Sequence, residues 1–130
     1  MNTLEEVRNF FEKDRFATEN GMVIDEIGEG YAKCSLSLSR RHKNAVGSVM
    51  GGVPFTLADF CYAVAANWKE AKWVSLSSQI TFLGTAKGNR LIAEANMVKS
   101  GRSTNYCEIY VTDERGNPVA KVIVTGFSKG

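Results

Sequence analysis

One carboxylate stands alone in an otherwise uncharged stretch of the chain. Between Asn44 and Trp68 the only charged residue is Asp59. An ionised carboxylate in apolar surroundings carries a large desolvation penalty unless partners or water compensate it. Asp59 is therefore either a helix-surface residue that reaches solvent or a carboxylate in a cleft, where it would act as general base or nucleophile.

Three glycines precede this carboxylate: Gly47, Gly51 and Gly52. Glycines at the start of a helix leave unpaired backbone N–H groups open to a ligand, and the helix dipole there favours developing negative charge. A helix start that polarises a carbonyl, followed about two turns later by a carboxylate, would suit acyl transfer. The spacing fits equally well with glycines that only permit a tight turn or close packing.

Other catalytic patterns are weaker or missing. The sequence has no G-x-S-x-G elbow, phosphate-binding loop, G-x-G-x-x-G fingerprint or H-E-x-x-H pair. The only histidine, His42, lies in the basic run from Arg40 to Lys43, which is typical of a solvated loop; contact with a phosphate-bearing ligand is the less favoured alternative. Cys61 has no histidine nearby in the sequence to activate it, so we expect it to pack in the core.

The composition indicates one domain over residues 1–130 and no nucleic-acid partner. The 16 Lys and Arg residues nearly balance 14 Asp and Glu residues, and the basic residues are mostly scattered. Cys34, Cys61 and Cys107 are widely spaced and form no C-x-x-C pair, which argues against a zinc site or a disulfide framework. No secretory signal or membrane span is recognisable. We expect a cytoplasmic protein with free thiols.

Two periodicities predict the elements that position these residues. Thr3 and Glu6 fit a capping box that begins a short amphipathic helix. Alternating apolar residues predict a hairpin within residues 22–38 and four more antiparallel strands within residues 74–128. The segment 52–68, whose only charged residue is Asp59, reads as a helix that is apolar on nearly every face and must be wrapped by the sheet. The prediction is an α+β fold in which six antiparallel strands curl around one central helix.

A motif in this segment resembles a known family. The stretch NAVGSVMGGVPFTLAD, residues 44–59, is similar to the N-x-x-G-x-x-H-G-G-x-x-x-x-L-x-D signature of hotdog-fold acyl-CoA thioesterases of the phenylacetate-pathway type. Residues 74–103 resemble the next two strands of that family and the turn that follows. The similarity covers about residues 21–128. The matching signature residues are Asn44, Gly47, Gly51, Gly52, Leu57 and Asp59.

The resemblance implies a hotdog fold, with an antiparallel sheet curled around a long helix. It also implies that subunits pair edge to edge, that active sites lie at the dimer interface, and that two dimers join as a tetramer. The implied substrate is an acyl-CoA, so CoA would enter as part of the substrate and neither a separate cofactor nor a metal is expected.

The resemblance also implies roles for individual residues. Asp59 would be the general base or nucleophile, and the Gly51 N–H would polarise the thioester carbonyl. Asn44 would orient the attacking water or the carbonyl, and Ser75 would position the water. Asn44 and Gly51 would come from one subunit, and Asp59 and Ser75 from its partner. Residues expected to contact the substrate or the nucleotide part of CoA are Met50, Gly52, Lys99, Gly101 and Arg102.

Met50 departs from the family pattern, because it stands where the signature has a histidine. The acid and the backbone donor remain, so hydrolysis stays feasible. Loss of the histidine leaves a second hypothesis open, in which the protein binds an acyl-CoA or another small ligand without cleaving it. The sequence does not specify the acyl group. Five aromatic residues either line a pocket or belong to the core: Phe55, Tyr62, Trp68, Trp73 and Phe82.

Overall fold

The computed structural model describes residues 1–130 and confirms the predicted elements. The hairpin, the central helix and the four later strands all form, and Thr3 and Glu6 make the capping box that begins the first helix. A second short helix and a 3-10 turn were not predicted. The elements in chain order are α1 (Leu4–Phe11), α2 (Arg15–Glu19), β1 (Val23–Gly28), β2 (Tyr31–Ser37), the 3-10 turn Arg40–His42, α3 (Gly52–Asn67), β3 (Trp73–Phe82), β4 (Arg90–Ser100), β5 (Thr104–Asp113) and β6 (Pro118–Ser128).

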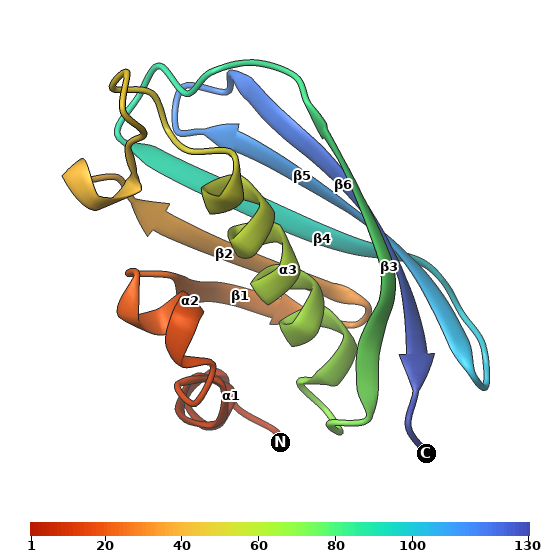
Figure 1. Ribbon diagram of the computed structural model, residues 1–130. Helices are drawn as coiled ribbons and strands as arrows, with labels where there is room; N and C mark the ends of the chain where they lie inside the picture. Colours follow the sequence, from red (N-terminus) through yellow and green to blue (C-terminus); the bar gives the residue numbers. More distant parts are fainter.

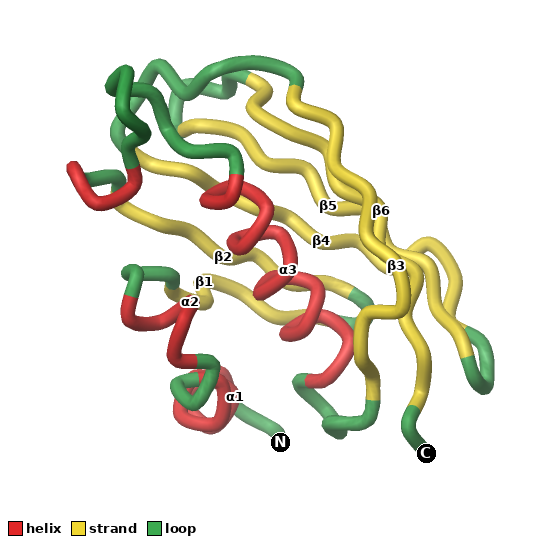
Figure 2. Tube along the Cα trace, viewed as in Figure 1, coloured by secondary structure: helices red, strands yellow, loops and turns green.

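The six strands form one antiparallel sheet in the order β1-β2-β4-β5-β6-β3. Between β2 and β3 the chain crosses the sheet through α3, so these two strands, which follow each other in the sequence, lie far apart in the sheet (Figure 1). The sheet curls around α3, which contacts every strand (Figure 2). This is the architecture that the hotdog resemblance implies. It leaves β1 and β3 as the two edge strands.

The composition of α3 explains why it lies inside the curl. Its sequence, GVPFTLADFCYAVAAN, consists mostly of apolar residues, and Pro54 falls in the first turn, where its missing N–H breaks no helical bond. Ten of its sixteen residues are buried. Gly52 and Asp59 are exposed and Thr56 is half-buried, and their spacing of four and three residues places them on one face of the helix. The acid therefore lies on the one stripe of α3 that the sheet leaves open.

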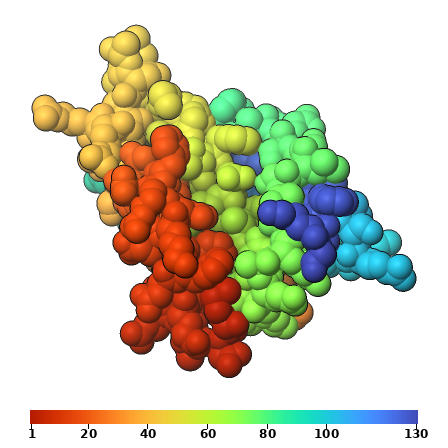
Figure 3. All heavy atoms as spheres, turned by 60° about the horizontal axis from the view of Figure 1, so that its bottom comes forward, coloured from red at the N-terminus to blue at the C-terminus, as the bar shows by residue number.

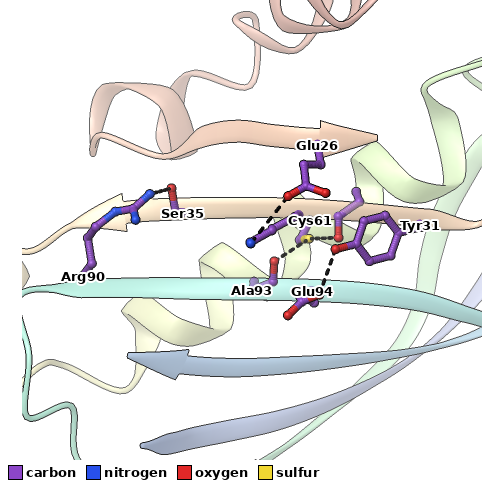
Figure 4. Close-up of polar contacts among 9 residues, drawn as sticks. Glu26, Tyr31, Ser35, Cys61, Arg90, Ala93 and Glu94 are labelled. Carbon is purple, nitrogen blue, oxygen red and sulfur yellow. Dashed lines mark hydrogen bonds and ion pairs between the residues drawn. The ribbon is translucent and has the colours of Figure 1, made fainter. Parts of the chain in front are cut away.

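Polar contacts fix this helix to the sheet. The Cys61 thiol donates to the backbone oxygens of Ala32 at 3.3 Å and Ala93 at 3.5 Å, which confirms Cys61 as a core residue (Figure 4). The next residue, Tyr62, donates from its Oη to Asn105 Oδ1 at 2.9 Å. All three cysteines are buried and unpaired. On the outer face of the sheet Tyr31 donates to Glu94 at 2.8 Å (Figure 4).

The two N-terminal helices lie beside β1 and cover part of α3 (Figures 1 and 3). From α1, Phe11 packs edge-on against Phe60 of α3, with ring centroids 6.3 Å apart. Ala17 is the only buried residue of α2. None of the helices combines the length and the apolar character that crossing a lipid bilayer requires.

Candidate active site

Asp59 and Ser75, predicted to act together, do lie together. Ser75 Oγ, on the edge strand β3, donates a hydrogen bond to Asp59 Oδ1 at 3.3 Å. The carboxylate reaches the surface and also lines a cavity of about 380 Å³. The protein atoms packed around it raise the pKa of Asp59, while the Ser75 hydrogen bond lowers it in part. The side chain thus lies on the helix surface and also lines a cavity, and its role as general base or nucleophile stays a prediction.

The start of α3 offers two free backbone donors. The N–H groups of Gly51 and Gly52 donate to no acceptor within the chain, whereas the next amide, that of Val53, donates to the Met50 oxygen at 2.9 Å. The φ angle of Gly51 is −57°, so this glycine is not required for its backbone conformation. A Cβ at Gly51 would instead come within 3.0 Å of the Phe82 ring. The two glycines therefore leave an open, positively polarised helix end.

The acid and the donor of one chain are too far apart to act on one thioester. Gly51 and Asp59 are eight residues apart, and a rise of about 1.5 Å per residue separates them by roughly 12 Å along the helix. A reacting carbonyl must lie within about 3 Å of both the attacking group and the polarising N–H. The acyl-transfer site that the spacing alone suggested therefore does not exist within a single chain.

Asn44 lies in the loop before α3 and holds that loop together. Its Oδ1 accepts hydrogen bonds from the N–H groups of Val46 at 3.1 Å and Ser48 at 3.0 Å. The turn passes through Gly47, whose φ of +84° favours glycine. The side chain is exposed, and its two hydrogen bonds both go through Oδ1, so its Nδ2 donates to no atom of the chain. The oxygen of Asn44 thus shapes the loop, and only the amide nitrogen remains free for a substrate.

Met50 lies beside the free helix start. Its side chain is 53% exposed and lines a second cavity, of about 280 Å³, together with Gly52. The Met50 N–H donates to the His42 oxygen at 2.9 Å. An apolar, flexible side chain thus stands at the place where the family signature has a histidine.

His42 does not lie in a solvated loop, contrary to the prediction. It is only 4% exposed. Its Nδ1 accepts from the Ser39 N–H at 2.9 Å, so Nε2 carries the hydrogen and donates to the Asn20 oxygen at 2.9 Å. The ring therefore connects the loop before α3 to the end of α2. Its neighbours Arg40, Arg41 and Lys43 remain exposed, as predicted.

The residues expected to meet the nucleotide of CoA lie elsewhere. Lys99, near the end of β4, and Gly101 and Arg102, in the turn between β4 and β5, are exposed. Ser100, the last residue of β4, lines a small hollow with Trp68, the residue that follows α3. This turn is thus at the opposite end of α3 from Gly51. Within one chain the structure does not bring them to Asp59.

Three residues near Asp59 were not identified from the sequence: Asp14, Phe16 and Thr56. All three line the 380 Å³ cavity beside it. Burial, and then the like charge of Asp59, raise the pKa of Asp14. Of the three, only Thr56 could have been recognised from the sequence. It is four residues after Gly52 and three before Asp59, a spacing that places all three on one face of a helix. No cluster of three or more His, Cys, Asp or Glu side chains has the geometry to hold a metal ion.

Comparison with known protein families gives one match. Residues 46–120 match the thioesterase superfamily. Among individual relatives, a provisionally named esterase of Archaeoglobus fulgidus is 37% identical over 82 residues, which are 62% of this chain and 53% of the relative. The match thus spans about half of that protein. The acyl-coenzyme A thioesterase PaaI of Escherichia coli is 29% identical over 111 residues, 85% of this chain and 79% of the relative.

Solved structures show the same fold. The structure of the Escherichia coli PaaI protein from the phenylacetic acid degradation operon superposes with a TM-score of 0.89 at 25% identity, over 98% of this chain and 97% of that one. A Streptococcus mutans protein bound to acetyl CoA superposes with a TM-score of 0.77 at 25% identity, over 85% of this chain and 90% of that one. These matches confirm the hotdog fold that the sequence predicted.

Proposed function

This chain belongs to the thioesterase superfamily, and we propose that it hydrolyses an acyl-CoA thioester to a free acid and CoA. The observation that carries the proposal is the Asp59 carboxylate, which Ser75 holds at an open cavity. Two relatives support the substrate class: the Escherichia coli protein is named an acyl-coenzyme A thioesterase, and the Streptococcus mutans structure contains acetyl CoA.

The proposed chemistry needs an acid, a polarised carbonyl and a leaving thiolate. Asp59 either takes a proton from the water that attacks the thioester carbon, or attacks that carbon itself to form an anhydride that water then hydrolyses. The Gly51 N–H stabilises the negative charge on the carbonyl oxygen. The C–S bond breaks, and CoA leaves as a thiolate that takes up a proton. Ser75 positions the water, and Asn44 orients the water or the carbonyl through its free amide nitrogen.

A second copy of the chain supplies the missing half of the site. β3 is an edge strand with unpaired backbone groups, and it carries exposed apolar side chains, including Leu76 at 67% exposure. Such an edge favours pairing with another strand. We propose that β3 pairs with β3 of a second subunit, which makes one continuous sheet across a homodimer.

Antiparallel pairing of the two β3 strands brings the required groups together. A two-fold axis reverses one strand relative to the other, so the Phe82 end of one strand lies beside the Ser75 end of its partner. In each chain Phe82 packs on Gly51, and Ser75 binds Asp59. The pairing therefore carries the Gly51 N–H of one subunit toward Asp59 of the other.

Mixing two inactive variants tests this shared site. Asp59→Asn removes the acid, and Gly51→Pro removes the N–H at a φ angle that proline accepts. Each variant alone should be inactive. Asp59→Asn should keep the wild-type melting temperature, whereas Gly51→Pro adds a Cβ that the Phe82 ring must move to accommodate. Co-refolded, they should recover about one quarter of the wild-type thiol release, because half of the dimers then hold one intact site. The matched control mixes wild type with the double variant, whose heterodimers should hold no intact site. The wild-type homodimers in this control should still give about one quarter of the wild-type thiol release. About one half in the control, with none in the first mixture, would show that both groups act within one chain.

The dimer also supplies a place for the nucleotide of CoA. Because β3 pairing sets the two α3 helices antiparallel, the turn that carries Lys99, Gly101 and Arg102 in one subunit approaches the helix start of the other. We propose that these residues contact the CoA phosphates, while Met50 and Gly52 contact the substrate nearer the carbonyl. We further propose that two dimers form a tetramer, which a mass measurement in solution tests, and that the enzyme is cytoplasmic.

Met50 favours one alternative function, a protein that binds acyl-CoA without cleaving it. The two hypotheses differ in thiol release from a panel of acyl-CoAs by wild type and by Met50→His. Release by wild type that Asp59→Asn abolishes supports the enzyme. Saturable binding without release, together with release by Met50→His, supports the binding protein.

A further inference from the structure

Two hollows lie on either side of the Phe16 side chain. Phe16 and Thr56 line the 380 Å³ cavity that contains Asp59, and the same two residues line the 280 Å³ cavity that contains Met50 and Gly52. Phe16 therefore forms a wall shared by the space around the acid and the space around the helix start. Figure 3 shows the N-terminal segment that carries it, in red to orange, lying against α3.

The Phe16 ring serves no visible purpose in the core. It is 74% exposed, whereas its neighbour Ala17 is buried. The backbone of Phe16 is nevertheless held in place, because its oxygen accepts a hydrogen bond from Asn20 Nδ2 at 2.7 Å. A large apolar ring on a fixed backbone, turned toward solvent beside a carboxylate, is an arrangement that suits contact with an apolar ligand.

A third cavity continues this apolar surface beneath α2. It has a volume of about 420 Å³ and lies between α1, β1 and α3. It shares Phe60 with the cavity of Asp59 and Met22 with the cavity of Met50, and Phe11 and Ile24 also line it. Charged side chains, among them Arg15 and Arg8, also line these cavities, but an apolar chain that starts at Asp59 and passes Phe16 can meet Phe60, Phe11 and Ile24.

We infer that Phe16 is a specificity-determining residue, against which the apolar acyl group of the thioester lies. This inference rests on the proposed function, because it concerns the acyl group of the same substrate. A two-carbon acetyl group has a single carbon beyond the carbonyl and so offers the ring little apolar surface. Acyl groups of about six carbons or more, and aryl-acetyl groups, extend far enough to bury it. The protein therefore prefers such acyl groups to acetyl.

Acyl-CoA kinetics test this assignment with Phe16→Ala and a matched control, Phe10→Ala. Phe10 is an exposed phenylalanine of α1 that lines none of the three cavities. With acetyl-, hexanoyl-, decanoyl- and phenylacetyl-CoA as substrates, Phe16→Ala should raise the KM for the longer and aromatic substrates roughly tenfold, since it removes most of the ring's contact area. The KM for acetyl-CoA and the melting temperature should stay unchanged. Equal changes for all acyl groups, or none, would overturn the assignment.

A binding measurement separates this inference from the proposed function. Calorimetry with S-methyl-CoA and S-decyl-CoA, thioethers that cannot be hydrolysed, should show tighter binding of the decyl ligand by wild type and by Phe10→Ala, and loss of that preference in Phe16→Ala. A wild type with this preference but no thiol release contradicts only the proposed enzyme. A wild type that releases thiol, with the decyl preference intact in Phe16→Ala, contradicts only the role of Phe16.

Discussion

Ser75 Oγ donates a 3.3 Å hydrogen bond to Asp59 Oδ1, and this bond joins the edge strand β3 to the open stripe of α3. The two residues come from the two elements that the crossover brings side by side. Since β3 is also the strand that we propose to pair with a partner, the acid is held by the element that would complete its site.

Substitution of Ser75 should change the pH dependence of activity. Burial raises the pKa of Asp59 and the Ser75 hydrogen bond lowers it, so Ser75→Ala should raise that pKa further. Activity needs the ionised carboxylate. The acidic limb of the kcat profile should therefore lie above the range of an ordinary aspartate and move to still higher pH in Ser75→Ala. Ser77→Ala, an exposed serine of the same strand, serves as control. If the activity of wild type, Ser75→Ala and Ser77→Ala fell at the same acidic pH, the Ser75 hydrogen bond would have no effect on the pKa of Asp59.

Removal of the acid should abolish turnover and leave the fold intact. Asp59→Asn should lower kcat at pH 7 by roughly a hundredfold or more, the usual contribution of a positioned base. Because Asp59 is exposed, the melting temperature should change little. Thiol release measures the first effect and calorimetry the second. Glu70→Gln, an exposed acid just beyond the same helix, should behave as wild type. Comparable turnover in both variants would rule out Asp59.

Substitution of His42 should weaken the fold. His42→Leu removes the buried ring that joins the Ser39 N–H to the Asn20 oxygen and so breaks two partly buried hydrogen bonds. An unsatisfied buried group costs about 1–3 kcal/mol, so the free energy of unfolding should fall by roughly that amount. Urea denaturation measures it, with Arg40→Leu in the same loop as control, since Arg40 is exposed. Equal stability of the two variants would show that the ring is not a structural link.

Asp113 should contribute stability that disappears in acid. Its burial opposes the charge, but hydrogen bonds from the Asn117 side chain and from the N–H groups of Lys87, Asn117 and Arg115 hold its pKa well below the usual range. A folded pKa below the unfolded one stabilises the protein above the unfolded value and stops doing so as the pH falls through the folded one.

The variant that tests this is Asp113→Asn. It replaces one carboxylate oxygen, an acceptor, by an NH2 group, a donor, which then faces the N–H groups that the oxygen had accepted from. It should be less stable than wild type at pH 7, and the difference in unfolding free energy should shrink toward pH 3. Urea denaturation at both pH values checks this, with the exposed Glu12→Gln as control. A difference that is independent of pH would contradict the ionised state of Asp113.

The sequence predicts the elements well because each has a strong periodic signal. Few alternatives are left by the alternation in residues 22–38 and 74–128 and by the segment 52–68, which is apolar except for a few residues such as Asp59. The order of the strands in the sheet could not be predicted from periodicity. It depends on the edge of the sheet at which the chain adds β3 after it has passed through α3. The helix α2 was not predicted, because its five residues are too few to show a helical periodicity.

Some residues of the candidate site could be predicted from the sequence, and others could not. Asp59 is visible as the lone charge of a buried helix, but its link to Ser75 came only from the family resemblance. The prediction that His42 lies in a solvated loop was wrong, because the charged sequence Arg40–Lys43 gives no indication that the ring of His42 is buried. The position of Phe16 beside Asp59 could not be predicted from the neighbouring sequence, because it depends on how α2 packs on α3.

The contact of α3 with all six strands also has a consequence for synthesis of the chain. The helix ends at Asn67, but the last strand that covers it ends at Ser128. A ribosome adds about 5–20 residues per second, so the part of this apolar helix that β3 to β6 cover stays exposed for several seconds while those strands are made. Its only charged side chain, Asp59, is then its only strong barrier to association with other nascent chains. Variants that neutralise this residue are therefore expected to yield less soluble protein at high expression, even where the finished fold is equally stable.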